Sequence, residues 1–274
     1  MVGVDESAST ARVDPVLEER WIRGGWRDGG RSVNGPASVR ARYSSADVLA
    51  SVTRHVFEVA RARGANVEQV IADAHLDTVS LGRARRVARA VDLAVWRAAS
   101  LQDPEVGLAA ATSPVVARAL GTAGFLARAS ATAFDGLLAI TEYYRLIYAD
   151  ISVSLRLLPD QVELNLVGGR VPLSRWPRAA VEFSALSILT LLRQAAGEPL
   201  NPVEVSLACR PASDASLARD FFACPIRHGQ PRNALLFHRV DLTKPLQSGR
   251  LERANFLLGV AQRELMVCRS AQGL

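Results

Sequence analysis

Apolar residues recur every three or four positions from Ser44 onward, the spacing that places them on one face of an α-helix. Ser44 and Asp47 form a capping-box pattern that predicts the start of the first helix, and Gly64 predicts its end. Its buried stripe consists of Val48, Val52, Val56 and Val59. Similar spacing predicts further helices over residues 66–74, 83–99, 104–111, 115–129 and 133–148. The first half of the domain is therefore predicted to be helical.

The period of the apolar positions changes to two at Ser152. Residues 152–157 and 162–166 alternate around a turn at Pro159-Asp160, which predicts a β-hairpin with one buried face. Downstream, the pattern predicts a long helix over 174–196, a strand over 203–209, a short helix over 214–222, and a last pair of strands, 225–228 and 233–238, around Gly229. Hairpins with intervening helices predict an α+β fold: an N-terminal helical region, then a mainly antiparallel sheet with packed helices and a C-terminal helix.

The two ends of the chain differ from this central part. Residues 1–43 are rich in Gly and Arg and lack apolar periodicity, so they are predicted to be a flexible leader. Residues 44–246 form the predicted α+β domain, and residues 247–274 form a closing helix.

The closing helix carries a heptad pattern that is typical of dimerisation. Three leucines recur every seven residues, each followed three positions later by a small residue. The predicted seam consists of Leu251, Ala254, Leu258, Ala261, Leu265 and Cys268. The alternative is a helix that packs only on its own domain, while Leu257, Val260 and Val267 form a second apolar face.

The basic composition does not predict a DNA-binding surface. The net charge is +6, yet Lys244 is the only lysine and the arginines are dispersed along the chain. Arg85, Arg86 and Arg89 lie largely off the apolar face of their predicted helix, which favours a solvated surface over a site for an anionic partner. We expect no DNA contact by this chain itself.

The cysteines and the lengths of the apolar runs indicate the cellular compartment of the protein. Cys209, Cys224 and Cys268 are far apart and odd in number, which argues against a disulfide framework or a zinc site. The N-terminus lacks a signal-peptide pattern, and no apolar run reaches the roughly 18–20 residues of a membrane span. A cytoplasmic protein without membrane contact is the expectation.

Motifs of catalysis are missing from the sequence. It contains no Gly-x-Ser-x-Gly, no His-x-x-x-His and no dinucleotide fingerprint. We therefore predict no enzymatic activity, no catalytic residues, no metal and no cofactor.

An aromatic cluster is the best candidate for ligand binding. Tyr143, Tyr144, Arg145 and Tyr148 lie within two helical turns, and aromatic rings beside a guanidinium suit an apolar ligand with one anionic group. The alternative is a core helix whose hydroxyl groups are satisfied.

The start of the long helix raises the same question. Trp176, Arg178 and Glu182 are the further candidates there. Arg178 and Glu182 are four residues apart and can pair with each other. Alternatively, Glu182 is buried and pairs with Arg145, because an unpaired buried carboxylate is costly.

Several short stretches, in order and spacing, resemble a known family. They are Gly121-Thr-Ala-Gly-Phe125, Ser130-Ala-Thr-Ala-Phe-Asp-Gly-Leu137, Tyr144-Arg-Leu146, Arg178-Ala-Ala-Val-Glu-Phe183, Phe221-Phe-Ala-Cys-Pro-Ile-Arg-His-Gly229, Asn233-Ala-Leu-Leu-Phe237 and Asp241-Leu-Thr-Lys-Pro-Leu246. Over about residues 46–246 the chain resembles the arabinose-binding-type N-terminal domain of AraC-family transcription regulators.

The resemblance implies a small-molecule effector domain that forms a homodimer and governs a C-terminal pair of helix-turn-helix units. Those units need roughly 100 residues, whereas 28 follow Leu246. The chain is expected to be either a truncated regulator or a stand-alone sensor, and its ligand need not be arabinose. A free-standing small-molecule-binding protein or an enzyme that has adapted the same pocket is the alternative function.

Overall fold

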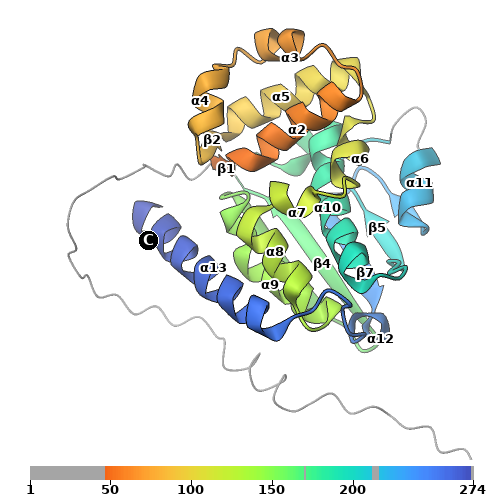
Figure 1. The fold of residues 1–274 in the computed structure, drawn as a ribbon. Helices are drawn as coiled ribbons and strands as arrows, with labels where there is room; N and C mark the ends of the chain where they lie inside the picture. Colours follow the sequence, from red (N-terminus) through yellow and green to blue (C-terminus); the bar gives the residue numbers. More distant parts are fainter. Residues whose placement is uncertain (1–46, 170, 212–215, 273–274) are drawn as a thin grey trace, which may run out of the picture. The chain divides into compact units, whose positions relative to one another are not determined.

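The chain divides into two units, Met1–Arg40 and Ala41–Leu274. The computed structural model describes residues 47–272 apart from residues 170 and 212–215 (Figure 1). The leader predicted over residues 1–43 lies outside the described residues.

The first described part is a small helical layer, closed by a two-stranded sheet. Its elements in chain order are β1 (Asp47–Leu49), α2 (Ala50–Ala62), α3 (Val67–Asp73), α4 (Thr78–Arg83), β2 (Arg86–Ala88) and α5 (Arg89–Gln102). β1 and β2 pair antiparallel, so that α2 and α5 start from neighbouring strands and pack against each other. Figure 1 shows this layer in orange and yellow.

Two predicted helix starts are wrong for the same reason. The first helix begins at Ala50, because Asp47 belongs to β1 and Leu49 caps α2 with an extended backbone and no side-chain hydrogen bond. The Leu49 N–H donates to the Ile147 carbonyl at 2.8 Å. The third predicted helix likewise begins at Arg89 rather than residue 83, because residues 86–88 pair with β1. Long-range strand pairing overrides the local helical spacing at both places.

A group of short helices follows. It consists of α6 (Val106–Ala111), α7 (Val116–Ala119), α8 (Gly121–Ala129), α9 (Ala133–Tyr143) and the 3-10 turn η1 (Tyr144–Leu146). α9 begins at a capping box: the Thr132 hydroxyl accepts from the Asp135 N–H, and the Asp135 carboxylate accepts from the Thr132 N–H. The helix predicted over 133–148 therefore starts as expected but ends at Tyr143, where the chain tightens into η1.

A five-stranded sheet forms the second half. Its strands are β3 (Ile151–Leu157), β4 (Gln161–Gly168), β5 (Glu204–Ser206), β6 (Ile226–Arg227) and β7 (Asn233–His238), in the spatial order β3-β4-β7-β5-β6. All neighbours are antiparallel except β5 and β6. The hairpin of β3 and β4 was predicted correctly, and the α+β fold class is confirmed.

The predicted pairing of the last two strands is wrong. β6 and β7 are not neighbours, because β5 lies between them and bonds to both. Its Val205 N–H donates to Pro225 O at 3.0 Å, and the Val203 N–H donates to Leu236 O at 2.6 Å. The strand predicted from the apolar alternation of residues 203–209 therefore lies between the two strands that were expected to pair. The turn residues around Gly229 suggested a hairpin, and they carry no information about a third strand between its arms.

The core is built around α10 (Arg178–Ala196), which follows the 3-10 turn η2 (Leu173–Arg175). α10 packs against α6, α8 and α5 on one side and contacts β7 of the sheet (Figure 1). It is the one helix of the described ranges that is long and apolar enough to cross a membrane, and 89% of the relevant window is buried inside the protein. α10 is thus accounted for as a core helix.

The remaining helices are α11 (Ser216–Phe222), α12 (Arg239–Leu242) and the closing helix α13 (Leu251–Gln272). The chain entering α13 is bonded to the end of α8 and to the turn between α8 and α9. Leu246 N–H donates to Ala131 O at 2.8 Å, Arg250 N–H donates to Ala129 O at 3.1 Å, and the Ser248 hydroxyl donates to Arg128 O at 2.5 Å. We call this bonded segment, residues 246–250, the α13 anchor.

The predicted seam of α13 faces its own domain. Ala261 is fully buried and Leu265 is 8% exposed, while Ala254, Leu258 and Cys268 are partly buried against the same core. Leu251 is the exception, at 75% exposed. The apolar residues turned outward are instead Leu251, Phe256, Met266 and Val267. The heptad pattern arises here from packing against α8 and η1.

Candidate functional site

Arg89, at the first position of α5, is the centre of a buried polar cluster. Its side chain is 4% exposed and forms an ion pair with Asp150, which is 8% exposed. Its guanidinium carbon lies 4.8 Å from the ring centre of Tyr148 and 4.3 Å from that of Trp176. Arg89 was predicted to lie on a solvated surface, and that prediction is wrong, because β2 places the start of α5 inside the domain.

Asp150 packs closely against a glycine. It follows the 144–149 segment and immediately precedes β3, opposite the end of β4. A Cβ atom at Gly169 would collide with the backbone carbonyl of Asp150. Glycine therefore permits this close approach.

Two stacked tyrosines form one wall of the cluster. Tyr144 and Tyr148 are almost fully buried, and their rings stack with centres 5.8 Å apart. The Tyr148 N–H donates to Tyr144 O at 3.0 Å, so one turn of backbone keeps the two rings aligned. Tyr148 also contacts the Trp176 ring at 5.9 Å. Burial raises the pKa of both phenols above their usual range.

Asp92 lies one turn after Arg89 and is 1% exposed. One carboxylate oxygen accepts from the Thr53 hydroxyl of α2 at 2.8 Å. Burial raises the pKa of Asp92 to about 6, although the Thr53 hydrogen bond and the charge of Arg89 both lower it. This carboxyl group can therefore change its charge near neutral pH.

These six residues, Arg89, Asp92, Tyr144, Tyr148, Asp150 and Trp176, are called the Arg89 cluster below. Within the described part of the chain, five of its buried polar atoms have no hydrogen-bond partner: Arg89 Nε and Nη1, Asp92 Oδ2, and the hydroxyls of Tyr144 and Tyr148. Buried polar groups in folded proteins are normally satisfied. The unpartnered donors and acceptors, with the aromatic rings beside Arg89, are groups that a polar and partly apolar small molecule can satisfy.

The structure brings together three of the seven predicted ligand-binding residues: Tyr144, Tyr148 and Trp176. Tyr143 is also buried, but its hydroxyl lies near Gln262 of α13, and burial raises its pKa to about 12. Arg145 lies close enough to Cys268 of α13 to lower the pKa of that thiol, which burial raises.

Arg178 and Glu182 pair with each other at the start of α10. Their Nη1–Oε1 distance is 2.9 Å, and Arg178 also donates to Pro104 O at 2.5 Å and lies 3.6 Å from Glu105. The alternative pairing of Glu182 with Arg145 is therefore wrong. Glu182 is 3% exposed, and burial raises its pKa to about 7 despite the charge of Arg178.

Sequence reasoning missed Arg89, Asp92 and Asp150. A signal was present for two of them, since Arg89 and Asp92 are three residues apart next to the apolar stripe of α5. Asp150 lies 61 residues from Arg89 and carried no local signal. Among the described residues, no three His, Cys, Asp or Glu side chains are grouped so that they could hold a metal ion.

Comparison with known proteins supports a regulator fold. Residues 64–246 match the family described as the arabinose-binding domain of AraC transcription regulator, N-terminal. The crystal structure of the transcriptional regulator CdpR from Pseudomonas aeruginosa superposes with a TM-score of 0.53 at 13% identity, over 81% of this chain and 66% of that chain. At that identity the likeness concerns the fold alone, and the chain spans just under two thirds of CdpR. No curated protein matches the sequence.

Proposed function

Because this chain belongs to the family of N-terminal arabinose-binding domains of AraC transcription regulators, we propose that it is a small-molecule effector-binding domain and that the effector contacts the Arg89 cluster. The observation that carries the proposal is the set of five buried polar atoms of the Arg89 cluster that have no hydrogen-bond partner among the described residues, together with the Tyr148 and Trp176 rings that pack on Arg89. The proposed action is binding and not catalysis.

The cluster indicates which chemical groups the effector offers. Asp150 already balances the charge of Arg89, so the free N–H groups of Arg89 suit a carbonyl, hydroxyl or carboxylate oxygen. The free oxygen of Asp92 suits a hydroxyl or amino donor. The rings of Tyr148 and Trp176 suit an apolar or flat part of the same molecule. This assigns the polar contact to Arg89, where the sequence had pointed to Arg145 or Arg178.

Effector binding can reach the closing helix through η1. Tyr144 of η1 belongs to the cluster, and η1 also contacts α13. An effector that orders η1 would therefore change the packing of α13. We propose that this helix transmits the effector signal and supports a homodimer in the cytoplasm, and that the chain itself does not contact DNA.

The proposal is tested by a thermal-shift screen of metabolites, followed by titration of each hit against tyrosine variants. Tyr148→Phe and Tyr144→Phe remove hydroxyls without partners and keep the stacked rings, so both variants should fold. We expect either change to weaken effector binding by about tenfold, the effect of a lost hydrogen bond of 1–1.5 kcal/mol.

Tyr143→Phe is the matched control, because its hydroxyl lies beside α13 and not in the cluster. It should leave effector affinity unchanged. Hits whose affinity is the same in wild type, Tyr144→Phe and Tyr148→Phe would show that the effector binds elsewhere.

A further inference from the structure

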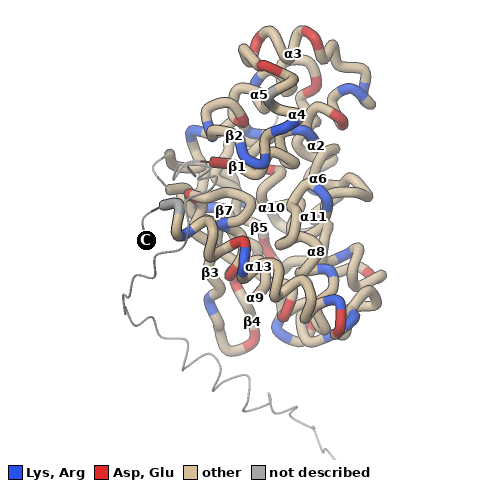
Figure 2. Tube along the Cα trace, turned by 60° about the vertical axis from the view of Figure 1, so that its left-hand side comes forward, with Lys and Arg blue, Asp and Glu red and all other residues tan. Residues whose placement is uncertain are grey.

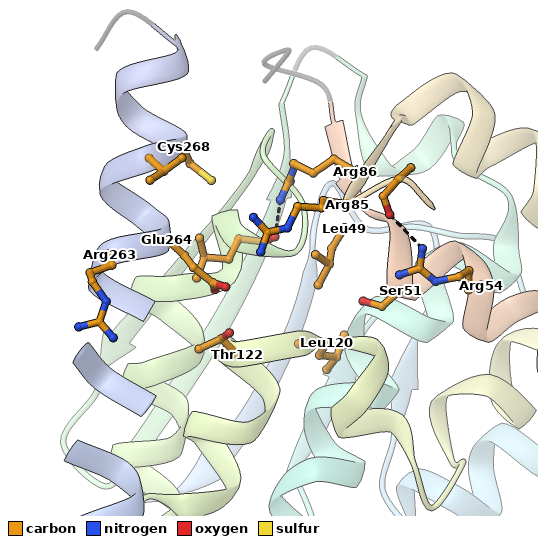
Figure 3. Close-up of a pocket in the computed structure, with 14 residues that line it drawn as sticks. Leu49, Ser51, Arg54, Arg85, Arg86, Leu120, Thr122, Arg263, Glu264 and Cys268 are labelled. Atoms are coloured by element: carbon orange, nitrogen blue, oxygen red, sulfur yellow. Dashed lines mark hydrogen bonds between the residues drawn. The ribbon is translucent and has the colours of Figure 1, made fainter. Parts of the chain in front are cut away.

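A pocket of about 370 Å³ lies between α13 and the body of the domain, separate from the lining of the Arg89 cluster (Figure 3). One wall is the second half of α13. The opposite wall comes from β1, the start of α2 and the chain entering β2, and the start of α8 completes the lining. Its volume lies near the lower end of the roughly 300–1,000 Å³ that is typical of small-molecule sites.

The charges that line the pocket are predominantly positive. The lining residues include Arg54, Arg85, Arg86 and Arg263, and one acidic residue, Glu264. Figure 2 shows basic residues following one another along the chain around α4 and β2. In the close-up, the Arg85 guanidinium projects into the space beside Leu49, whereas the Arg263 side chain points away from it (Figure 3).

The positive charge of Arg54 and Arg85 is not cancelled by neighbouring carboxylates. Within the described ranges, neither side chain forms an ion pair with an Asp or Glu. Arg85 is exposed and makes no side-chain hydrogen bond within the described ranges, so its planar guanidinium group can bind a carboxylate or a phosphate.

Two of the guanidinium groups are held in place by backbone carbonyls. Arg54 Nη1 donates to Leu81 O and Ala84 O, both at 3.0 Å. Arg86 donates to Leu146 O at 2.7 Å and to Asp47 O at 3.0 Å. Fixed charges favour an anion without the entropic cost of ordering long side chains.

The rest of the lining is largely apolar. Leu49, Leu120 and Leu146 contribute to it, with the Thr122 hydroxyl near Glu264 at its edge (Figure 3). A fully hydrated inorganic ion would leave this surface uncovered, whereas a short hydrocarbon chain would bury it.

We propose that this pocket binds a small organic anion, a carboxylate or phosphate ester with a short apolar part, and that the bound anion holds α13 against the domain. Arg85 supplies the movable contact, and Arg54 and Arg86 supply the fixed positive wall. The inference does not depend on the effector site at the Arg89 cluster, because the two sites share no residue.

Cys268 lines the pocket and provides a direct readout. The full chain is treated with iodoacetamide, and alkylation of each cysteine is followed by peptide mass spectrometry. The probes are hexanoate, hexyl phosphate and inorganic phosphate, with hexanamide as the uncharged match and NaCl to equalise ionic strength. Cys224, which is outside the pocket, is the control within the same molecule.

We expect hexanoate or hexyl phosphate to slow alkylation of Cys268 about fivefold when its concentration is four times its Kd, and to leave Cys224 unchanged. Inorganic phosphate and hexanamide should protect less. Arg85→Gln should raise the Kd of the anion about tenfold, because a hydrogen bond to a charged group is lost, so the same concentration should slow alkylation of Cys268 by only about 1.4-fold. Arg97→Gln, an exposed α5 variant outside the pocket, should behave as wild type.

Three results would overturn the proposal. They are a Cys268 rate that no anion alters, equal protection by hexanamide, and unchanged protection in Arg85→Gln. Protection that is lost in Tyr148→Phe and kept in Arg85→Gln would assign the anion to the Arg89 cluster instead.

Discussion

Arg89 and Asp92 are neighbours on one helix, yet each pairs with a different part of the fold. Arg89 pairs with Asp150 from the sheet side, and Asp92 accepts from Thr53 of α2. Arg89 is therefore compensated by a carboxylate, whereas for Asp92 the desolvation outweighs the Thr53 hydroxyl, the charge of Arg89 and the Trp96 indole, which all favour the ionised form. Burial of a carboxylate with so little compensation favours its neutral form.

Asp92 makes the stability of the domain depend on pH. Its pKa is about 6 in the folded chain and 3.8 in its ordinary state, so the folded state retains the proton longer than the unfolded state. The stabilising contribution is complete below about pH 4 and is lost as the pH rises through about 6, to a total of roughly 3 kcal/mol.

We expect Asp92→Asn to remove the loss of stability at high pH, because the amide keeps an oxygen for the Thr53 hydroxyl and cannot ionise. Urea unfolding at pH 4.5 and pH 8 measures the effect as a difference between wild type and variant. The variant should gain stability relative to wild type at pH 8. The same difference at both pH values would mean that Asp92 does not titrate in this range.

The residues of the site were only partly predictable. The aromatic members, Tyr144, Tyr148 and Trp176, were predicted as ligand-binding candidates because large rings with polar ends can be recognised from the sequence alone. Arg89 did not, since its burial depends on the pairing of β1 with β2 and on Asp150, both distant in sequence. A charged residue beside an apolar stripe looks solvated until tertiary contacts cover it.

At the scale of elements, helices and the hairpin followed from local periodicity, whereas boundaries and strand neighbours did not. α9 begins at the predicted residue, where both partners of its capping box lie within three residues of each other. β5, in contrast, is inserted between β6 and β7 by bonds to strands at least 20 residues away. A local sequence pattern predicts hydrogen bonds between residues that are close in the chain. It does not predict which distant strand supplies the hydrogen bonds across a sheet.

The contact between α6 and α10 depends on a glycine. A Cβ atom at Gly107 would lie 2.5 Å from Ala179 O and 2.6 Å from Ala179 Cα. Gly107→Ala should therefore force the helices apart and cost about 1–3 kcal/mol of unfolding free energy. Denaturant unfolding monitored by circular dichroism measures it.

Gly82→Ala is the matched control, because a Cβ atom there meets nothing within 4 Å. It should be neutral or stabilise the chain by up to about 1 kcal/mol, since Gly82 is helical in α4. Equal effects of the two substitutions would contradict tight packing of α6 on α10.

At the scale of the whole molecule, the proposed homodimer must use a surface other than the predicted seam. The seam residues Ala261 and Leu265 already contribute to the core of their own domain. Phe256 and Val267, eleven residues and about three turns apart, lie on the outward side and are 68% and 55% exposed. Exposed apolar side chains on one helix face are the surface that a second copy would cover.

We expect the wild-type chain to be a dimer and Phe256→Glu/Val267→Glu to be a folded monomer. Leu265→Glu should instead unfold the domain, because it places a charge against the core. Light scattering coupled to size exclusion gives the mass, and circular dichroism reports the fold. A monomeric wild type would contradict the dimer, and a dimeric double variant would place the interface elsewhere.

The α13 anchor fixes the start of the closing helix by hydrogen bonds, whereas its later turns are held by side-chain packing of Ala261 and Leu265. Twenty-two residues make α13 about 33 Å long. A rotation of about 10° at the anchor would displace the opposite end by about 6 Å over such a length. Glu264 and Cys268, which line the anion pocket, lie in the half that is farther from the anchor. A rotation that moves this half by several ångströms would break the contacts of a ligand bound there, so the ligand would favour the closed position of the helix by the full difference in its affinity for the two positions.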